Sequence, residues 1–159
     1  MISTSKILVP HDGSEMSDKA LNKAIEFCKS FKSELIILYV VDDRLIPSDA
    51  ILGFIREKLT LENAKIQTLR ILRMGAEAML KEKMKKASGY GVNVRFIIRM
   101  GSPAEGIADV AASEKVDLII MGSREGEREK EFGVEKPKLV GSVAKKVLEI
   151  AESAVMIIK

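Results

Sequence analysis

Hydrophobic positions along this chain form short unbroken runs that alternate with longer stretches of helical periodicity. The unbroken runs cover residues 6–10, 34–41, 92–98, 116–121 and 154–159. Runs of this length, rich in β-branched residues and bounded by turn-forming residues, are typical of parallel strands that are covered on both faces. The pattern therefore predicts five buried strands.

Between these runs, apolar residues recur every three or four positions, which predicts amphipathic helices. The predicted helices cover residues 15–31, 66–87 and 139–151, with a further helix that begins at Pro103. Ser14 is a candidate N-cap for the first helix. Ser102 and Glu105 have the spacing of a capping box, with Pro103 at the first helical position. Residues 44–60 have no clear periodicity.

Two helices carry apolar stripes whose inward face can be predicted residue by residue. The stripe of the long central helix consists of Ile66, Leu69, Ile71, Leu72, Ala76, Met79, Leu80, Met84 and Ala87. The inward residues predicted for the last helix are Val143, Val147, Leu148 and Ala151. Gly75 lies inside the long helix, where a glycine costs about 1 kcal/mol relative to alanine.

Regular alternation of strands and helices means that the strands pair in parallel through helical crossovers. The expected fold is therefore α/β: a single domain over residues 1–159, built as an open parallel five-stranded sheet with helices on both faces. The pattern alone does not determine the order of the strands.

The composition of the chain argues against nucleic acids and membranes as binding partners. The 26 basic and 23 acidic residues are interspersed, without the basic face that nucleic-acid binding needs. No apolar run approaches the roughly 20 residues that span a bilayer, and the N-terminal run is too short for a secretory signal. We therefore expect a cytoplasmic protein that binds neither nucleic acid nor membrane. The single cysteine, Cys28, lies on an inward stripe and is expected to be a buried structural thiol.

Ligands of such sheets bind beyond the carboxyl ends of the strands. The predicted strand ends carry Pro10-His11-Asp12-Gly13-Ser14, Val41-Asp42, Gly101-Ser102 and Met121-Gly122-Ser123, and Gly141-Ser142 precedes the last helix. Glycine lets the backbone approach a phosphate closely, and a helix N-terminus offers free amides and a partial positive charge. The Gly-Ser pairs favour a phosphate-bearing ligand on these grounds, but they are also common in ordinary turns. Both interpretations stand at this point.

His11 is the only histidine in the chain. A catalytic base would need an acidic partner, and the neighbouring Asp12 points to the opposite face of an extended strand. We therefore expect His11 to lie near a ligand without acting as a catalyst. The sequence also lacks the phosphate-binding loop of P-loop NTPases and the nucleophile elbow of α/β-hydrolases.

The stretches "KILVPHDGSEMSDKAL", "VDLIIMGSR" and "LVGSVAKKVLEIAESAVMIIK" resemble the universal stress protein family. The resemblance covers nearly the whole chain, apart from residues 44–60 and the charged loop. It implies a Rossmann-like sheet of strand order 3-2-1-4-5, a stress-response or signalling role, and a homodimer, which here would pair through the last strand. For one branch of the family it also implies binding of ATP, with Mg²⁺ as an optional companion.

In that branch, residues that end strands one and two frame the adenosine, and Asp12 and Val41 match them. The phosphates lie against a motif of Gly, two residues, Gly, nine residues, Gly and then Ser or Thr. The nucleotide-binding residues implied by the resemblance are Pro10, His11, Asp12, Val41, Met121, Gly122, Ser123, Gly126, Gly141, Ser142 and Val143.

The middle of the phosphate motif departs from the family pattern. Glu125 stands where the second glycine belongs, Gly126 follows one place later, and fourteen residues rather than nine separate it from Gly141. The extra length costs only about 0.6 kcal/mol per doubling of an exposed loop, so it permits the geometry. A carboxylate at position 125 would repel a polyphosphate unless a cation lay between them.

Three functional hypotheses remain open at the level of sequence. The first is an ATP-binding module that hydrolyses ATP weakly at most, because no general base is visible. The second is a nucleotide-free dimeric interaction protein whose charged loop meets a partner. The third, a weak ATPase or nucleotidyl-transfer enzyme, has the least support.

Overall fold

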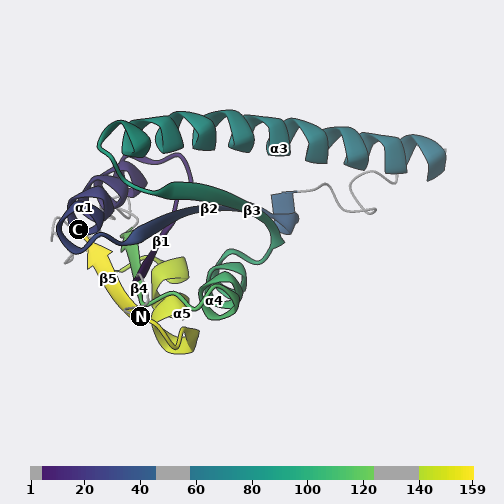
Figure 1. The fold of residues 1–159 in the computed structure, drawn as a ribbon. Helices are drawn as coiled ribbons and strands as arrows, with labels where there is room; N and C mark the ends of the chain where they lie inside the picture. The colour runs from purple at the N-terminus through teal and green to yellow at the C-terminus, as the bar shows by residue number, and fades with distance from the viewer. Residues whose placement is uncertain (1–4, 46–57, 124–139) are drawn as a thin grey trace, which may run out of the picture.

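The computed structural model describes residues 5–45, 58–123 and 140–159. Its centre is a five-stranded sheet of order β3-β2-β1-β4-β5, which confirms the predicted fold class (Figure 1). Each strand pairs in parallel with its neighbours. The elements along the chain are β1 (Lys6–Pro10), α1 (Glu15–Phe31), β2 (Glu34–Asp42), the 3-10 turn η1 (Asp43–Leu45), α3 (Lys58–Gly89), β3 (Val94–Gly101), α4 (Pro103–Ser113), β4 (Leu118–Gly122), α5 (Ser142–Ile150) and β5 (Ala154–Ile158).

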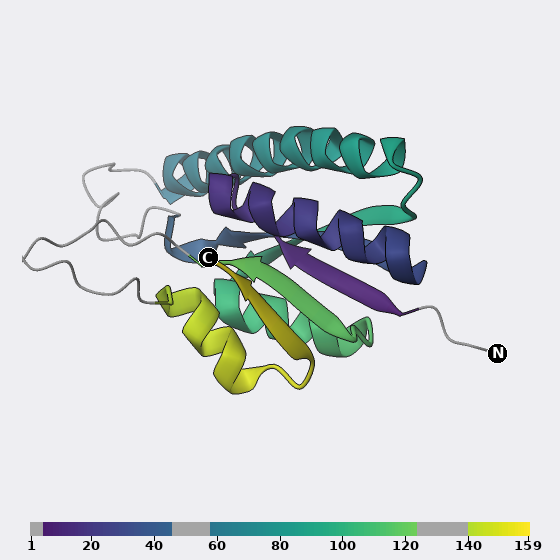
Figure 2. The same cartoon turned by 90° about the vertical axis from the view of Figure 1, so that its left-hand side faces the viewer.

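Helices α1 and α3 cover one face of the sheet, and α4 and α5 cover the other (Figure 2). Successive strand residues alternate between the two faces. Ile7 and Val9 therefore join the core beneath α1 and α3, whereas Leu8 joins the core against α4 and α5. Burial on both faces explains why the strand segments are almost continuously apolar.

Several predicted boundaries are confirmed. Strand β1 and helix α1 begin and end at the predicted residues, and β2 runs one residue further, to Asp42. The Ser14 hydroxyl caps α1 as predicted, since it accepts a hydrogen bond from the Ser17 amide at 3.2 Å. Strands β3 and β4 begin later than predicted, at Val94 and Leu118.

The capping box predicted for α4 does not form. Ser102 occupies the N-cap position, but its side chain makes no hydrogen bond to a helix amide. Its hydroxyl instead donates to the carboxylate of Glu105. The two side chains have the spacing of a capping box, yet the Ser102 hydroxyl binds the Glu105 carboxylate rather than the helix amide that it would accept from in a capping box.

Helix α3 extends beyond the sheet that it covers (Figure 1). Its C-terminal half is anchored, with Ala76, Leu80 and Ala87 buried. In the other half the predicted inward stripe is wrong at Ile66 and Ile71, which are 49% and 69% exposed, whereas Leu69 and Leu72 are partly buried. A helix of 32 residues is about 48 Å long, whereas the nine residues of β2 span about 30 Å. In the described part of the chain, no helix has both the length and the apolarity needed to cross a membrane.

Helix α5 begins at Ser142, later than the predicted start, and position 139 lies outside the described residues. Val147 and Ala144 form its buried face. Leu148 was predicted to point inward but is 48% exposed. Leu148 lies about 100° around the helix from Val147, and the buried face of α5 is too narrow to include both.

Candidate functional site

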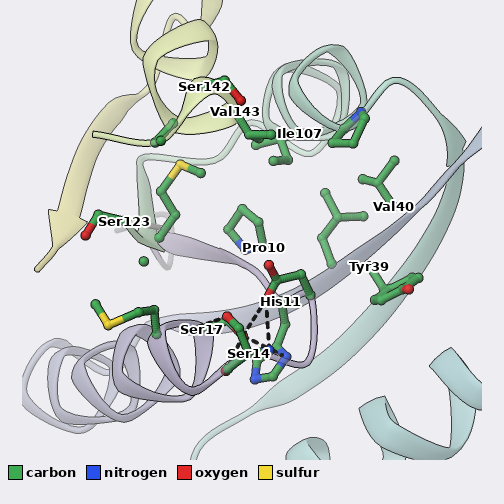
Figure 3. Close-up of a pocket in the computed structure, with 18 of the residues that line it drawn as sticks. Pro10, His11, Ser14, Ser17, Tyr39, Val40, Ile107, Ser123, Ser142 and Val143 are labelled. Carbon is green, nitrogen blue, oxygen red and sulfur yellow. Dashed lines mark hydrogen bonds between the residues drawn. The ribbon is translucent and has the colours of Figure 1, made fainter. Parts of the chain in front are cut away.

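A cavity of about 570 Å³ opens where the carboxyl ends of β1, β2 and β4 meet the starts of α1, α4 and α5. The predicted site residues that line it are Pro10, His11, Asp12, Met121, Gly122, Ser123, Gly141, Ser142 and Val143. The Gly-Ser pairs at 122–123 and 141–142 are distant in sequence and meet here. In Figure 3, Ser142 and Val143 lie across the cavity from the group formed by His11, Ser14 and Ser17.

The turn after β1 holds the carboxylate of Asp12 in place. Gly13 has φ +86°, a left-handed conformation that favours glycine. Asp12 Oδ1 accepts hydrogen bonds from the Ser14 amide at 2.9 Å and from the Ser17 hydroxyl at 3.0 Å. Desolvation raises the pKa of Asp12, but these hydrogen bonds outweigh it and hold the pKa below its usual value. Asp12 is therefore ionised at neutral pH and exposed toward the cavity.

His11 forms part of the cavity wall, but its ring nitrogens are bound within the protein. Its side chain is buried, with Nε2 3.0 Å from Oδ1 of Asp18. The Gly13 amide donates to Nδ1 at 3.1 Å. Burial is the largest influence and lowers the pKa of His11 below its usual 6.5, although Asp18 acts in the opposite direction. The imidazole is therefore neutral at pH 7.

At the end of β2, the side chain of the predicted site residue Val41 is buried. Its side chain is 5% exposed and does not line the cavity, which is bordered instead by its neighbours Val40 and Asp42. Tyr39 of the same strand also lines the cavity, so burial of Val41 is specific to its position near the end of β2. Asp42 is already paired with Arg44, whose Nε donates to Oδ1 at 2.8 Å. That hydrogen bond lowers the pKa of Asp42.

The end of β4 packs against the start of α1. A Cβ atom at Gly122 would lie 2.7 Å from the backbone carbon and oxygen of Met16, so close packing alone requires a glycine there. The amide of Ser123 donates to the carbonyl of Ile158 at 2.8 Å, which extends the pairing of β4 with β5. The Ser123 amide is therefore not free for a phosphate, contrary to prediction. Its side chain still lines the cavity.

Among the described residues, the first amides of α5 have no hydrogen-bond acceptor, and they lie at the cavity. Gly141 occupies the N-cap position with φ −60° and ψ 157°, and it makes no side-chain capping hydrogen bond. The Lys145 amide donates to the Gly141 carbonyl, so the first intrahelical bond begins there. The amides of Ser142 and Val143 precede that bond and lack an intrahelical acceptor. Helix α1, by contrast, is capped by Ser14.

The cavity has an apolar side and a polar side. The apolar side was not predicted from sequence, and it is formed by Leu38, Val40, Pro103, Ile107 and Ala144. These residues look like ordinary core positions in the sequence. The one sequence feature related to this surface is Gly106 on α4. A Cβ there would approach the Val40 methyls to 3.2 Å, so the glycine lets α4 pack close to β2.

The charged side chains of the described lining are acidic: Asp12, Glu15 and Asp42. Positive potential therefore comes from the N-terminus of α5 rather than from a lysine or arginine of the described lining. Within residues 5–45, 58–123 and 140–159, no group of three or more His, Cys, Asp or Glu side chains is arranged to hold a metal ion. Gly126 and Glu125 lie outside the described residues.

Comparison with known proteins places this geometry in a family. A model described as the universal stress protein family matches residues 3–159. Universal stress protein MJ0531 of Methanocaldococcus jannaschii is 34% identical over 157 residues, which cover 97% of this chain and 81% of that protein. Universal stress protein YxiE of Bacillus subtilis is 32% identical over 167 residues, which cover 98% of this chain and 99% of that protein.

Solved structures share the fold. The structure of hypothetical protein MJ0577 superposes with a TM-score of 0.77 at 28% identity, covering 99% of this chain and 97% of that one. Universal stress protein UspA from Lactobacillus plantarum has the same TM-score at 23% identity, with full coverage of both chains. The likeness extends over the whole sheet and both helical layers.

Proposed function

This chain belongs to the universal stress protein family, and from that premise we propose that it is a binding module for an adenine nucleotide, ATP, with a signalling role in the cytoplasmic stress response. The observation that carries the proposal is the cavity at which the Asp12 carboxylate, the Gly122-Ser123 turn and the uncapped start of α5 meet. Its volume of about 570 Å³ falls within the range of roughly 300–1,000 Å³ typical of small-molecule sites.

The two sides of the cavity suit the two ends of a nucleotide. The apolar surface of Leu38, Val40 and Ile107 provides a face for the base, and the ionised Asp12 accepts hydrogen bonds from sugar hydroxyls. The free amides at Ser142 and Val143 suit a phosphate, because a helix N-terminus combines donors with a partial positive charge.

A triphosphate in this cavity would meet the acidic side chains Asp12, Glu15 and Asp42. Mg²⁺ bound to the phosphates would offset that repulsion, and for this reason we include the ion in the proposal. The ion would be held chiefly by the nucleotide, since the described residues contain no metal-binding cluster of their own.

Two universal stress proteins have been solved in complex with adenine nucleotides, one with cAMP and one from Archaeoglobus fulgidus with dAMP. At 19% and 17% identity they share the fold with this chain, and the proposal rests on the cavity itself. We further propose binding without rapid hydrolysis. Both nitrogens of His11 are bound within the protein, so it is not placed as a general base.

The first test is to identify what the protein carries and what stabilises it. Mass spectrometry of small molecules released from freshly purified protein is expected to find an adenine nucleotide. Thermal shift with ATP, ADP, AMP and adenosine, with and without Mg²⁺, should show stabilisation of about 2.7 kcal/mol at 100 times the Kd. Absence of both a released nucleotide and any thermal shift would overturn the proposal.

The second test removes one amide from the start of α5. Ser142→Pro deletes the N–H at the first helical position, where proline is well tolerated, as Pro103 shows at the start of α4. Loss of a charge-assisted hydrogen bond is expected to weaken AMP binding about tenfold and adenosine binding much less. Ser142→Ala keeps the amide and should lose less affinity than Ser142→Pro. Equal losses for AMP and adenosine would contradict a phosphate at α5.

A second function is favoured by the edge of the sheet. Strand β5 lies at the end of the sheet and pairs with β4 on one side. Such an edge suits a homodimer through the last strand, in which the protein acts as a nucleotide-free interaction module. Sedimentation velocity over a range of concentrations should then show a dimer whether or not nucleotide is present. A monomer at all concentrations would exclude this alternative.

A further inference from the structure

A chain of polar contacts connects the carboxylate at the cavity with a lysine on α3. The Asp12 carboxylate accepts from the Ser17 hydroxyl at 3.0 Å, and the Ser17 oxygen lies 3.3 Å from Nδ1 of His11. On the other side of the ring, Nε2 of His11 lies 3.0 Å from Oδ1 of Asp18. The same Asp18 oxygen lies 2.8 Å from Nζ of Lys83. Figure 3 shows the part of this chain that borders the cavity.

The partners of His11 determine which ring nitrogen carries the proton. The ionised Asp18 carboxylate accepts hydrogen bonds and cannot donate, so Nε2 is the donor. The Gly13 amide donates and cannot accept, so Nδ1 is the acceptor. Both requirements are met by a ring that is protonated on Nε2 alone.

This tautomer also directs the hydroxyl of Ser17. Its single proton has three acceptors within reach: Asp12 Oδ1, the Ser14 carbonyl oxygen at 2.8 Å, and Nδ1 of His11. Because Nδ1 already accepts from Gly13, the hydroxyl is left to Asp12 and to the Ser14 carbonyl. Ser17 is 4% exposed, so water does not compete for it.

Protonation of Nδ1 would disturb this arrangement. The ring would then face the Gly13 amide donor to donor, and the turn that carries Asp12 would lose a hydrogen bond. The charged groups that face the ring are Asp18 from α1, Lys83 from α3 and Asp12 from the turn after β1. The arrangement around Asp12 therefore depends on contacts from two helices.

We propose that His11 is a positioning residue for ligand binding: protonated on Nε2 and anchored to α3 through Asp18 and Lys83, it holds the Gly13 turn and the Ser17 hydroxyl that orient the Asp12 carboxylate. The inference rests on the proposed function, because the ligand that Asp12 addresses is the nucleotide. His11 acts through Asp12 and not by contact with the ligand. Lys83, which is distant in sequence, thereby helps to hold the site in place through its contact with Asp18.

The tautomer can be measured directly without any ligand. Since His11 is the only histidine in the chain, its imidazole gives one set of NMR signals. A long-range ¹H–¹⁵N correlation spectrum of the intact protein at pH 7 is expected to show the proton on Nε2. A proton on Nδ1, or an averaged signal from both tautomers, would overturn the inference irrespective of nucleotide binding.

The anchor on α3 is tested by a matched pair of lysine variants, with AMP as the probe. Lys83→Met removes the contact to Asp18, whereas Lys81→Met removes a lysine of the same helix that pairs with Glu77 at 2.8 Å. Lys83→Met is expected to raise the pKa of His11, because the Lys83 charge lowers it, and to weaken AMP binding. Lys81→Met should change neither. A Lys83→Met protein with lowered thermal stability but unchanged His11 pKa and AMP affinity would overturn the anchor.

The acceptor at Nδ1 is tested by partial rescue. His11→Asn supplies a side-chain oxygen near the place of Nδ1, and His11→Leu supplies none. AMP binding should weaken by at least about tenfold in His11→Leu and less in His11→Asn. If wild-type protein binds AMP and both variants match it, the positioning role fails and the proposed function survives. If the wild-type protein binds no adenine nucleotide, both fail. Lys83→Met decides the matter should His11→Leu not fold.

Discussion

At the scale of single residues, Gly122 and Gly75 have opposite environments although both interrupt apolar segments. Gly122 ends β4 against the backbone of Met16, and a Cβ there would lie 2.7 Å from two backbone atoms. Gly75 lies in the middle of α3, exposed, and a Cβ added to it would meet nothing within 4 Å beyond the backbone of its own helix. One glycine is required by close packing, and the other costs helix stability without a compensating contact.

These environments predict opposite effects of the same substitution. Gly122→Ala should lower the free energy of unfolding by about 1–3 kcal/mol, because backbone atoms must move to admit the methyl group. Gly75→Ala should raise it by about 0.5–1 kcal/mol, because alanine loses less backbone entropy in a helix. Urea unfolding followed by circular dichroism measures both. A Gly122→Ala protein as stable as wild type would show that the contact between β4 and α1 is looser than the structure indicates.

At the scale of elements, the starts of the helices differ in how their amides are satisfied. The Ser14 hydroxyl accepts from a helix amide of α1, whereas the Ser102 hydroxyl before α4 is turned to the Glu105 side chain. Helix α5 begins at Ser142 after the N-cap residue Gly141, which has no capping side chain, and this start lines the cavity across from Asp12. An uncapped start is a cost in stability that a bound anion would offset.

The two serines at N-cap positions provide the second prediction. Ser14→Ala should lower the free energy of unfolding by about 1 kcal/mol, because it leaves an amide of α1 without its acceptor. Ser102→Ala should change it by less than about 0.5 kcal/mol, because the exposed hydroxyl caps nothing. Chemical denaturation without nucleotide measures both. Equal destabilisation by the two substitutions would contradict the difference in capping.

At the scale of the whole molecule, two apolar cores cover the faces of the sheet, and a small cluster of buried polar side chains lies beside the cavity. This cluster contains His11 and Ser17, which are 2% and 4% exposed. Their hydrogen bonds are made with the imidazole uncharged, so the folded protein resists protonation of His11. Protonation of His11 therefore couples the free energy of unfolding to pH in the range just below neutrality.

The third prediction concerns this coupling. The pKa of His11 is lower in the folded than in the unfolded chain, so the unfolded chain binds the proton more readily. The free energy of unfolding should be greatest above pH 6.5 and fall as the pH decreases below it, until the folded-state pKa is passed. The pKa values of Asp12 and Asp18 are lowered in the folded protein, so these residues also stabilise it. Their contribution to the free energy of unfolding is lost only at more acidic pH, below about 3.8.

Urea midpoints at pH 8, 7, 6 and 5 test the third prediction, with His11→Asn as the comparison. The wild-type protein should lose stability between pH 7 and 5, and the variant should lose less because it has no imidazole to protonate. Parallel pH profiles for the two proteins would assign the loss to other groups.

Much of the fold follows from local pattern, because the periodicity of apolar residues reflects backbone geometry that neighbouring residues share. The bounds of β1 and α1 and the cap at Ser14 were predictable for this reason. The strand order was not contained in periodicity, and it came from resemblance to a family. Exposure along α3 was not predictable either, since the extent of the sheet decides which turns of that helix are covered.

By itself, the sequence determined the kinds of elements and the placing of Gly-Ser turns where strands end, since both depend on backbone preferences of adjacent residues. The tertiary structure alone decided which hydrogen-bond partner each group at the site has and whether its side chain faces the cavity. It paired the Ser123 amide with Ile158, turned Val41 away from the cavity, and left the start of α5 open. Hydrogen-bond partners and facing surfaces come from residues far apart in the chain, and only the packed sheet brings them together.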